Sequence, residues 1–233
     1  MHIFYTNQIN GSIATLSEEE SIHCARVLRL NCGDRVNLID GAGGFYLGEV
    51  TEAHPKHSTV SILETTTEYG IRPYSLHVAI APTKNIDRFE WFLEKAVEIG
   101  VDEITPILCD RSERKDVKLD RSFRVVLAAA KQSMHAYLPR VNPMTPFKQL
   151  MAMDNDGSRA IAYCEGDARP LLHHWLKPGA SCTVLVGPEG DFSPAEVELA
   201  FGKNFTAVSL GSSRLRTETA GVMAAAALSL LNC

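Results

Sequence analysis

Apolar and polar residues alternate along most of the first 65 positions, and such alternation predicts short, half-buried strands. The extended runs read HIFYT, RVNLID, GFYLGEV and STVSIL, and turn-forming clusters such as NCGD and DGAGG separate them. One helix is expected between them, because Ser17 and Glu20 have the spacing of a capping box and Ile22, Ala25 and Leu28 would form its buried stripe. The N-terminal part is therefore predicted to be a small antiparallel barrel.

The hydrophobic pattern changes after the polar segment ETTTEYGIRP, which is expected to be a linker. From residue 75 the apolar runs read SLHVAIAP, DEITPILC, RAIAYC, CTVLVG and TAVSLG, and helical stretches lie between most of them. The clearest helix is expected over residues 87–99, where buried positions recur at Phe89, Phe92, Leu93, Ala96 and Val97. This alternation is typical of a parallel sheet with crossover helices. We predict two domains, residues 1–70 and residues 71–233, the second with an α/β fold.

The composition is that of an ordinary globular protein with a sizeable core, since 45% of the 233 residues are hydrophobic and 22% are charged. Its six cysteines, at positions 24, 32, 109, 164, 182 and 233, show no C-x-x-C pair and no zinc-ligand spacing. Free thiols in a reducing compartment are the simplest interpretation, and no metal is expected. No signal peptide and no apolar run of membrane-spanning length is recognised, so a cytoplasmic protein without a membrane partner is expected.

The net charge of -5 hides an uneven distribution along the chain. Residues 1–70 hold 4 Lys and Arg against 9 Asp and Glu, so this part alone has a net charge of -5. Residues 111–140 contain 8 basic residues against 3 acidic ones, a local excess of +5. A basic segment of this kind is a candidate phosphate-binding face.

The stretch TVLVGPEGDFSPAEVELA places a turn directly after an apolar strand. The strand is expected to end at Gly187, and a helix to begin with the capping box of Ser193 and Glu196 around Pro194. Loops at the carboxyl ends of parallel strands bind ligands in open α/β sheets, although a plain strand-to-helix turn would have the same spacing. Neither G-x-G-x-x-G nor G-x-x-x-x-G-K-[ST] occurs, which disfavours a nucleotide-dependent enzyme.

Residues 210–231, LGSSRLRTETAGVMAAAALSLL, join a polar loop to a helix that is almost wholly apolar. Such a helix is expected to be buried on every side, inside the domain or between subunits. Arg214 and Arg216 then need partners or a cavity, because an unpaired buried charge is costly. Either Glu218 or Glu189 neutralises them, or they line a crevice, shared with the preceding glycine loop, for a small ligand and an anionic second substrate.

These two C-terminal stretches, LVGPEGDFSPAEVE and SLGSSRLRTETAGVMAA, together resemble the signature motifs of the RsmE-type methyltransferases. The likeness extends to HCARVLRLNCGDRVNLIDGAGGFYLGEV, which is similar to the family's PUA-like barrel, and to APTKNIDRFEWFLEKAVEIGVDEITPILCDRSER. It implies a SPOUT fold, an α/β sheet whose C-terminal segment is threaded into a trefoil knot. It also implies a homodimer with the last helix in or near the interface. The activity implied is methylation of N3 of a uridine in 16S ribosomal RNA, free or in the small ribosomal subunit, with S-adenosylmethionine as methyl donor.

The resemblance and the residue types together name the expected site. Backbone groups of the two glycine loops are expected to bind the adenosyl group, at Val186, Gly187, Gly190, Leu210, Gly211, Leu215 and Thr217. Arg216 is expected to position the uracil or stabilise its N3 anion, and Glu218 or Glu189 to orient Arg216 or accept the proton. RNA is expected to contact basic side chains in both domains, at His23, Arg26, Arg29, Arg111, Arg114, Lys115 and Lys131.

The chain departs from the family pattern at residues 131–135, where KQSMH stands in place of a sequence close to EQSGR. Basic character is kept at Lys131 and partly at His135. Two other interpretations stay open. One is a methyltransferase of the same fold that acts on another rRNA or tRNA nucleotide, and the other is a non-catalytic RNA-binding adaptor.

Overall fold

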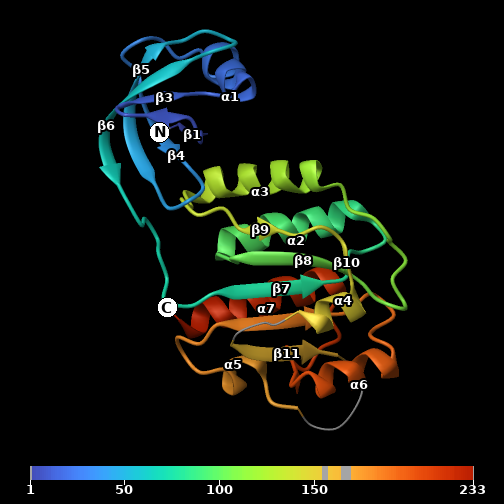
Figure 1. The fold of residues 1–233 in the computed structure, drawn as a ribbon. Helices are drawn as coiled ribbons and strands as arrows, with labels where there is room; N and C mark the ends of the chain where they lie inside the picture. Colours follow the sequence, from blue (N-terminus) through green and yellow to red (C-terminus); the bar gives the residue numbers. More distant parts are fainter. Residues whose placement is uncertain (1, 154–156, 164–168, 233) are drawn as a thin grey trace. The chain divides into compact units, whose positions relative to one another are not determined.

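The computed structural model describes residues 2–153, 157–163 and 169–232, and it divides the chain into two compact units (Figure 1). The N-terminal unit contains Met1–Ile71 and Leu127–Leu138, and the C-terminal unit contains Arg72–Val126 and Pro139–Cys233. Four of the six predicted free thiols are confirmed, at Cys24, Cys32, Cys109 and Cys182. The other two, Cys164 and Cys233, lie outside the described residues.

The N-terminal unit is built on a six-stranded sheet with the order β1-β4-β5-β6-β3-β2. Its strands are β1 (Ile3–Tyr5), β2 (Ile9–Asn10), β3 (Ile13–Thr15), β4 (Arg35–Ile39), β5 (Phe45–Glu52) and β6 (Thr59–Thr66). The four predicted strands are present, but the sheet is not wholly antiparallel, because β1 lies parallel to β4. Parallel pairing needs a long crossover, and the segment from β2 through the helix supplies it. Strand β6 extends to Thr66, so the predicted linker begins as strand.

Helix α1 (Glu18–Ile22) begins at the predicted N-cap, where the Ser17 hydroxyl accepts a hydrogen bond from the Glu20 amide at 3.3 Å. Only this half of the predicted capping box forms. The Glu20 carboxylate turns instead to Lys131, with Oε1 2.5 Å from Nζ. The buried carboxylate therefore links the helix to the segment Leu127–Leu138.

The buried stripe predicted for this helix holds only in part. Leu28 packs partly buried against the core and Ala25 is half-buried, but Ile22 is exposed. Ser21 and Cys24 are the fully buried positions instead. A π-helix, His23–Val27, follows directly after Ile22, so the 3.6-residue spacing from Ile22 to Ala25 and Leu28 is not kept across it.

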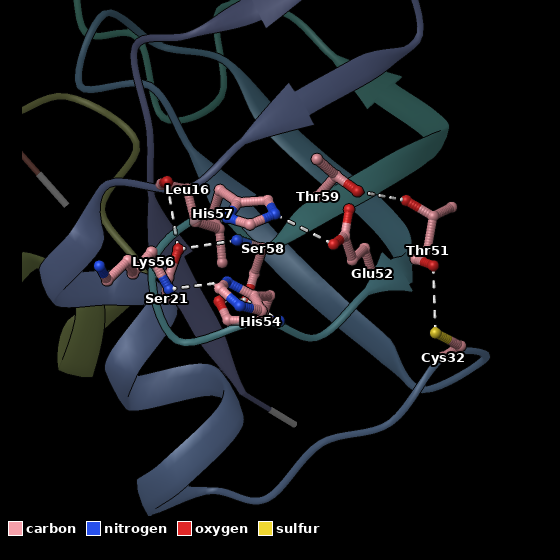
Figure 2. Close-up of polar contacts among 10 residues, drawn as sticks. All are labelled: Leu16, Ser21, Cys32, Thr51, Glu52, His54, Lys56, His57, Ser58 and Thr59. Atoms are coloured by element: carbon pink, nitrogen blue, oxygen red, sulfur yellow. Dashed lines mark hydrogen bonds and ion pairs between the residues drawn. The ribbon is translucent and has the colours of Figure 1, made fainter.

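A buried serine attaches this helix to strand β6 (Figure 2). The Ser21 hydroxyl donates to Leu16 O at 3.2 Å and accepts from the Ser58 amide at 2.9 Å. The Ser58 hydroxyl in turn donates to His54 O at 3.0 Å. These bonds add to the apolar contacts of Cys24 and Leu28 in holding the helix on the sheet.

Residues 127–138 complete the N-terminal unit from a distant part of the sequence. The Gly43 amide donates to Ala136 O at 3.1 Å. The Tyr137 ring packs so closely on Gly43 that an added Cβ would lie 2.3 Å from it, and Gly43 has φ +99°. Glycine is required there both by the contact and by the backbone.

The C-terminal unit contains a seven-stranded sheet with the order β10-β8-β7-β12-β11-β13, and β9 pairs with β8. All pairs between its described strands are parallel, as predicted. The strands are β7 (Leu76–Ile80), β8 (Glu103–Leu108), β9 (Arg140–Val141), β10 (Thr145–Pro146), β11 (Ser158–Ala162), β12 (Cys182–Val186) and β13 (Thr206–Val208). Strands β9 and β10 have two residues each, which is too short to leave a periodic pattern.

Helices cover both faces of this sheet (Figure 1). Successive strand residues point to opposite faces, so Val78 and Val184 belong to one apolar core and Ala79 and Leu185 to the other. The first core lies under α2 and α7, and the second lies under α4 and α6. The helices are α2 (Ile86–Ile99), α3 (Leu119–Ser133), α4 (Phe147–Ala152), α5 (Leu172–Trp175), α6 (Pro194–Gly202) and α7 (Thr217–Leu231). The buried face predicted for α2 and the capping box predicted for α6 are both confirmed.

Helix α7 is buried on one face within the chain, so it is not enclosed inside the domain, and burial of its other face between subunits stays a prediction. Its core-facing residues include Gly221, Ala224, Ala225 and Leu228. Gly221 allows a close approach, since an added Cβ would lie 2.6 Å from the Phe92 ring and 2.7 Å from Ile80. Met223 and Leu230 are 42% and 75% exposed. The small residues thus serve tight packing on one face, and an apolar surface is left on the other.

Candidate functional site

A buried hydrogen bond joins the loop after β12 to the start of α7. The Thr217 hydroxyl donates to Gly187 O at 3.1 Å. Gly187 follows the last residue of β12, Val186, and this strand pairs with β7 on one side and β11 on the other. The two segments for which the sequence predicted a shared crevice therefore meet near the middle of the sheet.

A pocket of about 600 Å³ lies at the start of α7. Its lining comes from the beginnings of two helices, with Arg214, Leu215, Arg216, Glu218 and Thr219 at α7 and Asp87, Arg88 and Trp91 at α2. Arg216 is the N-cap residue of α7, and no side chain caps this helix. An uncapped N-terminus presents free N–H groups and a partial positive charge, which suit an oxygen atom of a ligand.

Two arginines at this pocket are available to a ligand. Arg214 and Arg216 are exposed, and neither forms an ion pair among the residues that the structure describes. Glu218 is only 7% exposed, and its Oε1 lies 3.9 Å from Nε of Arg88 instead. The pocket therefore holds one buried carboxylate beside several cations.

Glu189 lies outside this pocket and contacts the loop after β7. Its Oε1 accepts a hydrogen bond from the Lys84 amide at 3.0 Å. Of the three predicted catalytic residues, the structure thus brings Arg216 and Glu218 together and leaves Glu189 apart. The alternative in which Glu218 or Glu189 neutralises the two arginines is wrong for the described residues.

Among the glycines of the two loops, Gly211 leaves open space at the backbone, whereas Gly190 and Gly187 are already packed against side chains. Gly211 has φ +143°, a conformation that favours glycine, and no atom lies within 4 Å of the place of a Cβ. At Gly190 the nearest atom would lie 3.4 Å away, whereas at Gly187 the Phe192 ring already lies at 3.1 Å. The remaining predicted cofactor-binding residues border the same loops and are Val186, Leu210, Leu215 and Thr217.

Arg111 and Arg114, predicted to bind RNA, hold the site loops in place. Arg111 Nη1 donates to Gly190 O at 2.9 Å. Arg114 Nε donates to Thr83 O at 2.9 Å, and its Nη2 donates to Lys84 O at 2.6 Å. The loop after β8 therefore binds the backbone of both neighbouring loops. Sequence reasoning missed this role because an arginine that binds carbonyl groups and one that binds phosphate leave the same signal.

The other predicted RNA contacts fall into two groups. Lys115, in the C-terminal unit, is exposed, as are Arg26 and Arg29 in the N-terminal unit. His23 and Lys131 line a second pocket, which lies wholly within the N-terminal unit. The structure thus brings His23 and Lys131 together and leaves the other three as exposed surface charges.

Three lining residues at the start of α2 were not predicted, namely Asp87, Arg88 and Trp91. Trp91 is 42% exposed although its ring is large and apolar. An exposed tryptophan on the polar side of an amphipathic helix is the signal that could have found this wall.

The described residues offer neither a metal site nor a membrane span. Among them, no group of three or more His, Cys, Asp or Glu side chains could hold a metal ion. No described helix combines the length and hydrophobicity that crossing a bilayer requires.

Comparison with known proteins places the chain in a family. Residues 71–229 match the RNA methyltransferase domain, and residues 16–63 match the RNA methyltransferase PUA domain. Ribosomal RNA small subunit methyltransferase E of Synechocystis sp. is 32% identical over 230 residues, which cover 96% of this chain and 75% of the relative. The chain belongs to the RsmE family. The RsmE protein of Bacillus subtilis is 28% identical over 92% of this chain and 89% of its own length.

Solved structures agree with the RsmE assignment. A probable rRNA-methyltransferase from Porphyromonas gingivalis is 39% identical, with a TM-score of 0.91 over 100% of this chain and 98% of that chain. Ribosomal RNA small subunit methyltransferase E from Neisseria gonorrhoeae, bound to S-adenosyl methionine, is 27% identical, with a TM-score of 0.89 and the same coverage. The predicted fold class, a parallel-sheet α/β domain preceded by a PUA-like domain, is confirmed. Threading of the C-terminal segment into a knot stays a prediction.

Proposed function

We propose that this RsmE protein transfers the methyl group of S-adenosylmethionine to N3 of a specific uridine in 16S ribosomal RNA. The observation that carries the proposal is the pocket at α7, where unpaired arginines and an uncapped helix N-terminus meet. A relative that matches along the whole chain is bound to the same methyl donor. The partner is the RNA, free or in the small ribosomal subunit, and the expected location is the cytoplasm.

The residues present suit an adenosyl ligand. Open space above Gly211 lets a ligand approach backbone N–H and C=O groups, which recognise a base and a ribose without charged side chains. The exposed ring of Trp91 offers a planar apolar wall in the pocket at the start of α7. When bound, S-adenosylmethionine supplies an already activated methyl group, so no metal is needed.

The protein must orient the uracil and remove the N3 proton. The free guanidinium of Arg216 offers a planar fork of donors to the uracil oxygens as negative charge develops. Glu218, held beside it by Arg88, is the residue proposed to accept the proton. Glu189 supports the site through the Lys84 amide instead. The uracil must leave its stack for its N3 edge to reach these groups.

Replacing Arg216 with alanine tests the central role in this scheme. Methyl transfer to 16S rRNA from a strain that lacks the enzyme should fall by about 100-fold or more, the usual cost of one oxyanion donor. The affinity for S-adenosylmethionine, measured by calorimetry, should stay within about twofold, and Arg216→Lys should recover only part of the rate because it lacks the fork. Full activity in Arg216→Ala would refute the role of this residue. If the unaltered protein fails to bind the donor stoichiometrically, the adaptor interpretation is favoured.

RNA affinity is proposed to come from exposed cations in both units. Lys115, Arg26 and Arg29 have no ion pair among the described residues and are free to contact phosphates. Arg111 and Arg114 are proposed to act mainly by holding loops, since Nη1 of Arg111 and Nε and Nη2 of Arg114 donate to backbone carbonyls.

We also propose that the exposed apolar face of α7 forms a homodimer interface. Leu230 is 75% exposed on a helix that carries no charged residue after Glu218. Leu230→Glu should convert a dimer to a monomer in light scattering. Leu63→Glu, at a leucine of the N-terminal unit that is 48% exposed, should leave the mass unchanged. A monomeric mass for the unaltered protein would contradict this interface.

A further inference from the structure

The N-terminal unit has a pocket of about 450 Å³ that the proposed catalysis does not use. It lies where the π-helix, strands β1 and β4 and the end of α3 meet, all within one unit. Hydrogen-bonding side chains line it at His2, His23, Asn37, Lys131 and Gln132. A concave site with several converging polar groups is typical of small-ligand recognition.

Asn37 gives the strongest evidence that this pocket binds something. It lies on β4 and is only 5% exposed, yet its side chain reaches the pocket. Within the described part of the chain, its carboxamide forms no hydrogen bond, and its polar atoms are not fully enclosed, since Glu20 Oε2 is the one fully buried side-chain atom without a partner there. The polar end of this largely buried residue is therefore accessible from the pocket. The amide, with two donors and an acceptor, is therefore placed to pair with a ligand.

The charge of the pocket argues against an anion. Lys131 is its one side chain with a fixed positive charge among the described lining residues, and Glu20 Oε1 lies 2.5 Å from its Nζ. Glu20 is 5% exposed, so its negative charge is held against the lysine rather than dispersed in solvent. A phosphate would meet a cation that is already neutralised. The lining suits a neutral ligand with several hydrogen-bonding atoms.

The shape and the apolar walls indicate a flat ring. The His23 ring is held edge-on against Phe4, with centroids 6.0 Å apart and planes at 70°. Leu28 and Met134 add apolar surface. Unpaired RNA bases are recognised in this way, by stacking on rings that include histidine and by hydrogen bonds along the base edge.

We infer that this pocket binds one unpaired nucleobase of the RNA substrate other than the methylated uridine. The Asn37 carboxamide reads the edge of the base, and the His23 ring packs on its face. This inference rests on the proposed function for the identity of the RNA. It adds a base contact to a unit whose other proposed contacts are with phosphates.

Nucleoside monophosphates test the pocket directly, without methyl transfer. The four ribonucleoside 5′-monophosphates are titrated into the full-length protein, and the side-chain amide signals of Asn37 are followed by NMR after assignment with Asn37→Leu. At least one nucleotide should shift these signals, whereas ribose 5-phosphate, which lacks the base, should not. Equal shifts with ribose 5-phosphate would show a phosphate site, and no shift with any nucleotide would also overturn the inference.

Asn37→Leu also separates a binding role from a structural one. This nearly isosteric change removes a carboxamide that forms no hydrogen bond within the described part of the chain, so the melting temperature should change little. The KM for 16S rRNA should rise about tenfold, as expected for losing one good base contact, while kcat and the donor affinity stay unchanged. Asn10→Leu, at an exposed strand residue of the same unit, is the control and should change none of these values.

An unchanged KM in stable Asn37→Leu protein would contradict the base-binding role. If this variant does not fold, the nucleotide titration of the unaltered protein still decides. If nucleotides bind but the enzyme does not methylate 16S rRNA, the proposed function fails and the pocket stands. If methylation is normal and nucleotides do not bind, only the pocket fails.

Discussion

Arg114 and Lys115 are neighbours in sequence with opposite expected roles, and methionine at each position separates them. Arg114 donates one part-buried hydrogen bond to Thr83 O at 2.9 Å and one exposed bond to Lys84 O at 2.6 Å. A bond from a charged donor contributes about 1.5 kcal/mol when partly buried and under about 1 kcal/mol when exposed. Arg114→Met should therefore cost about 2 kcal/mol, or about 4–8 °C in the unfolding of the C-terminal unit.

The loss should also weaken binding of the methyl donor. Thr83 and Lys84 precede α2, whose first residues line the pocket at α7. We expect about half of the stability lost in Arg114→Met to come from holding the loop at Thr83 and Lys84 in its binding position. The dissociation constant for S-adenosylmethionine should then rise about fivefold. Calorimetry with S-adenosylmethionine measures the affinity, and differential scanning calorimetry measures the stability.

Lys115→Met is the matched control. Lys115 is exposed and has no ion pair among the described residues, so donor affinity and melting temperature should not change. RNA binding should instead lose about 0.7–0.9 from the slope of log K against log salt, the value for one phosphate contact. The loop-holding role of Arg114 is refuted if Arg114→Met keeps its stability and donor affinity and reduces the salt slope as Lys115→Met does.

Three further outcomes are expected. Burial lowers the pKa of His77, so below pH 6.5 the unfolded chain takes up a proton that the folded chain resists. Stability should then fall with falling pH, by at most about 1.4 kcal/mol per pH unit, and His77→Gln should flatten this fall in urea titrations at pH 5 to 7. Thr217→Val leaves the buried Gly187 carbonyl without a hydrogen-bond donor, so stability should fall by about 1–3 kcal/mol and the affinity for S-adenosylmethionine should fall as well. If calorimetry shows both values unchanged, the bond between Thr217 and Gly187 does not hold the two loops together. Iodoacetamide at pH 8 should label exposed Cys32 and spare Cys182, whose pKa burial raises to about 12, as peptide mass spectrometry can show.

The fold could be predicted where burial follows a regular period. Helix α2 buries the five predicted residues because a single face meets the sheet. The stripe of the N-terminal helix could be predicted only in part, because a π-helix changes the period within the element. The membership of Leu127–Leu138 in the N-terminal unit was equally hidden, since one regular helix, α3, runs through the division between the units.

The site could be predicted where it depends on the path of the chain. The glycine turn and the start of α7 are joined through Gly187 and Thr217, as two glycine-ended strands implied. What a guanidinium contacts is not encoded by its position in the sequence, because long side chains reach several partners. Arg111 and Arg114 therefore proved to bind loop carbonyls, and Glu189 proved to bind the Lys84 amide.

The N-terminal unit is formed by two separate segments of the chain, which limits how it can fold during synthesis and how it can be recombined with other proteins. A polypeptide cut after Ile71 would keep the whole six-stranded sheet but lose Lys131, leaving the carboxylate of Glu20 buried without its cation. Breaking a buried pair in this way costs about 3–5 kcal/mol, a large part of the stability of a small domain. During synthesis the N-terminal unit is therefore complete only after residue 138 has been added, although its sheet ends at Thr66, and residues 1–71 alone cannot be transferred to another protein as a complete unit.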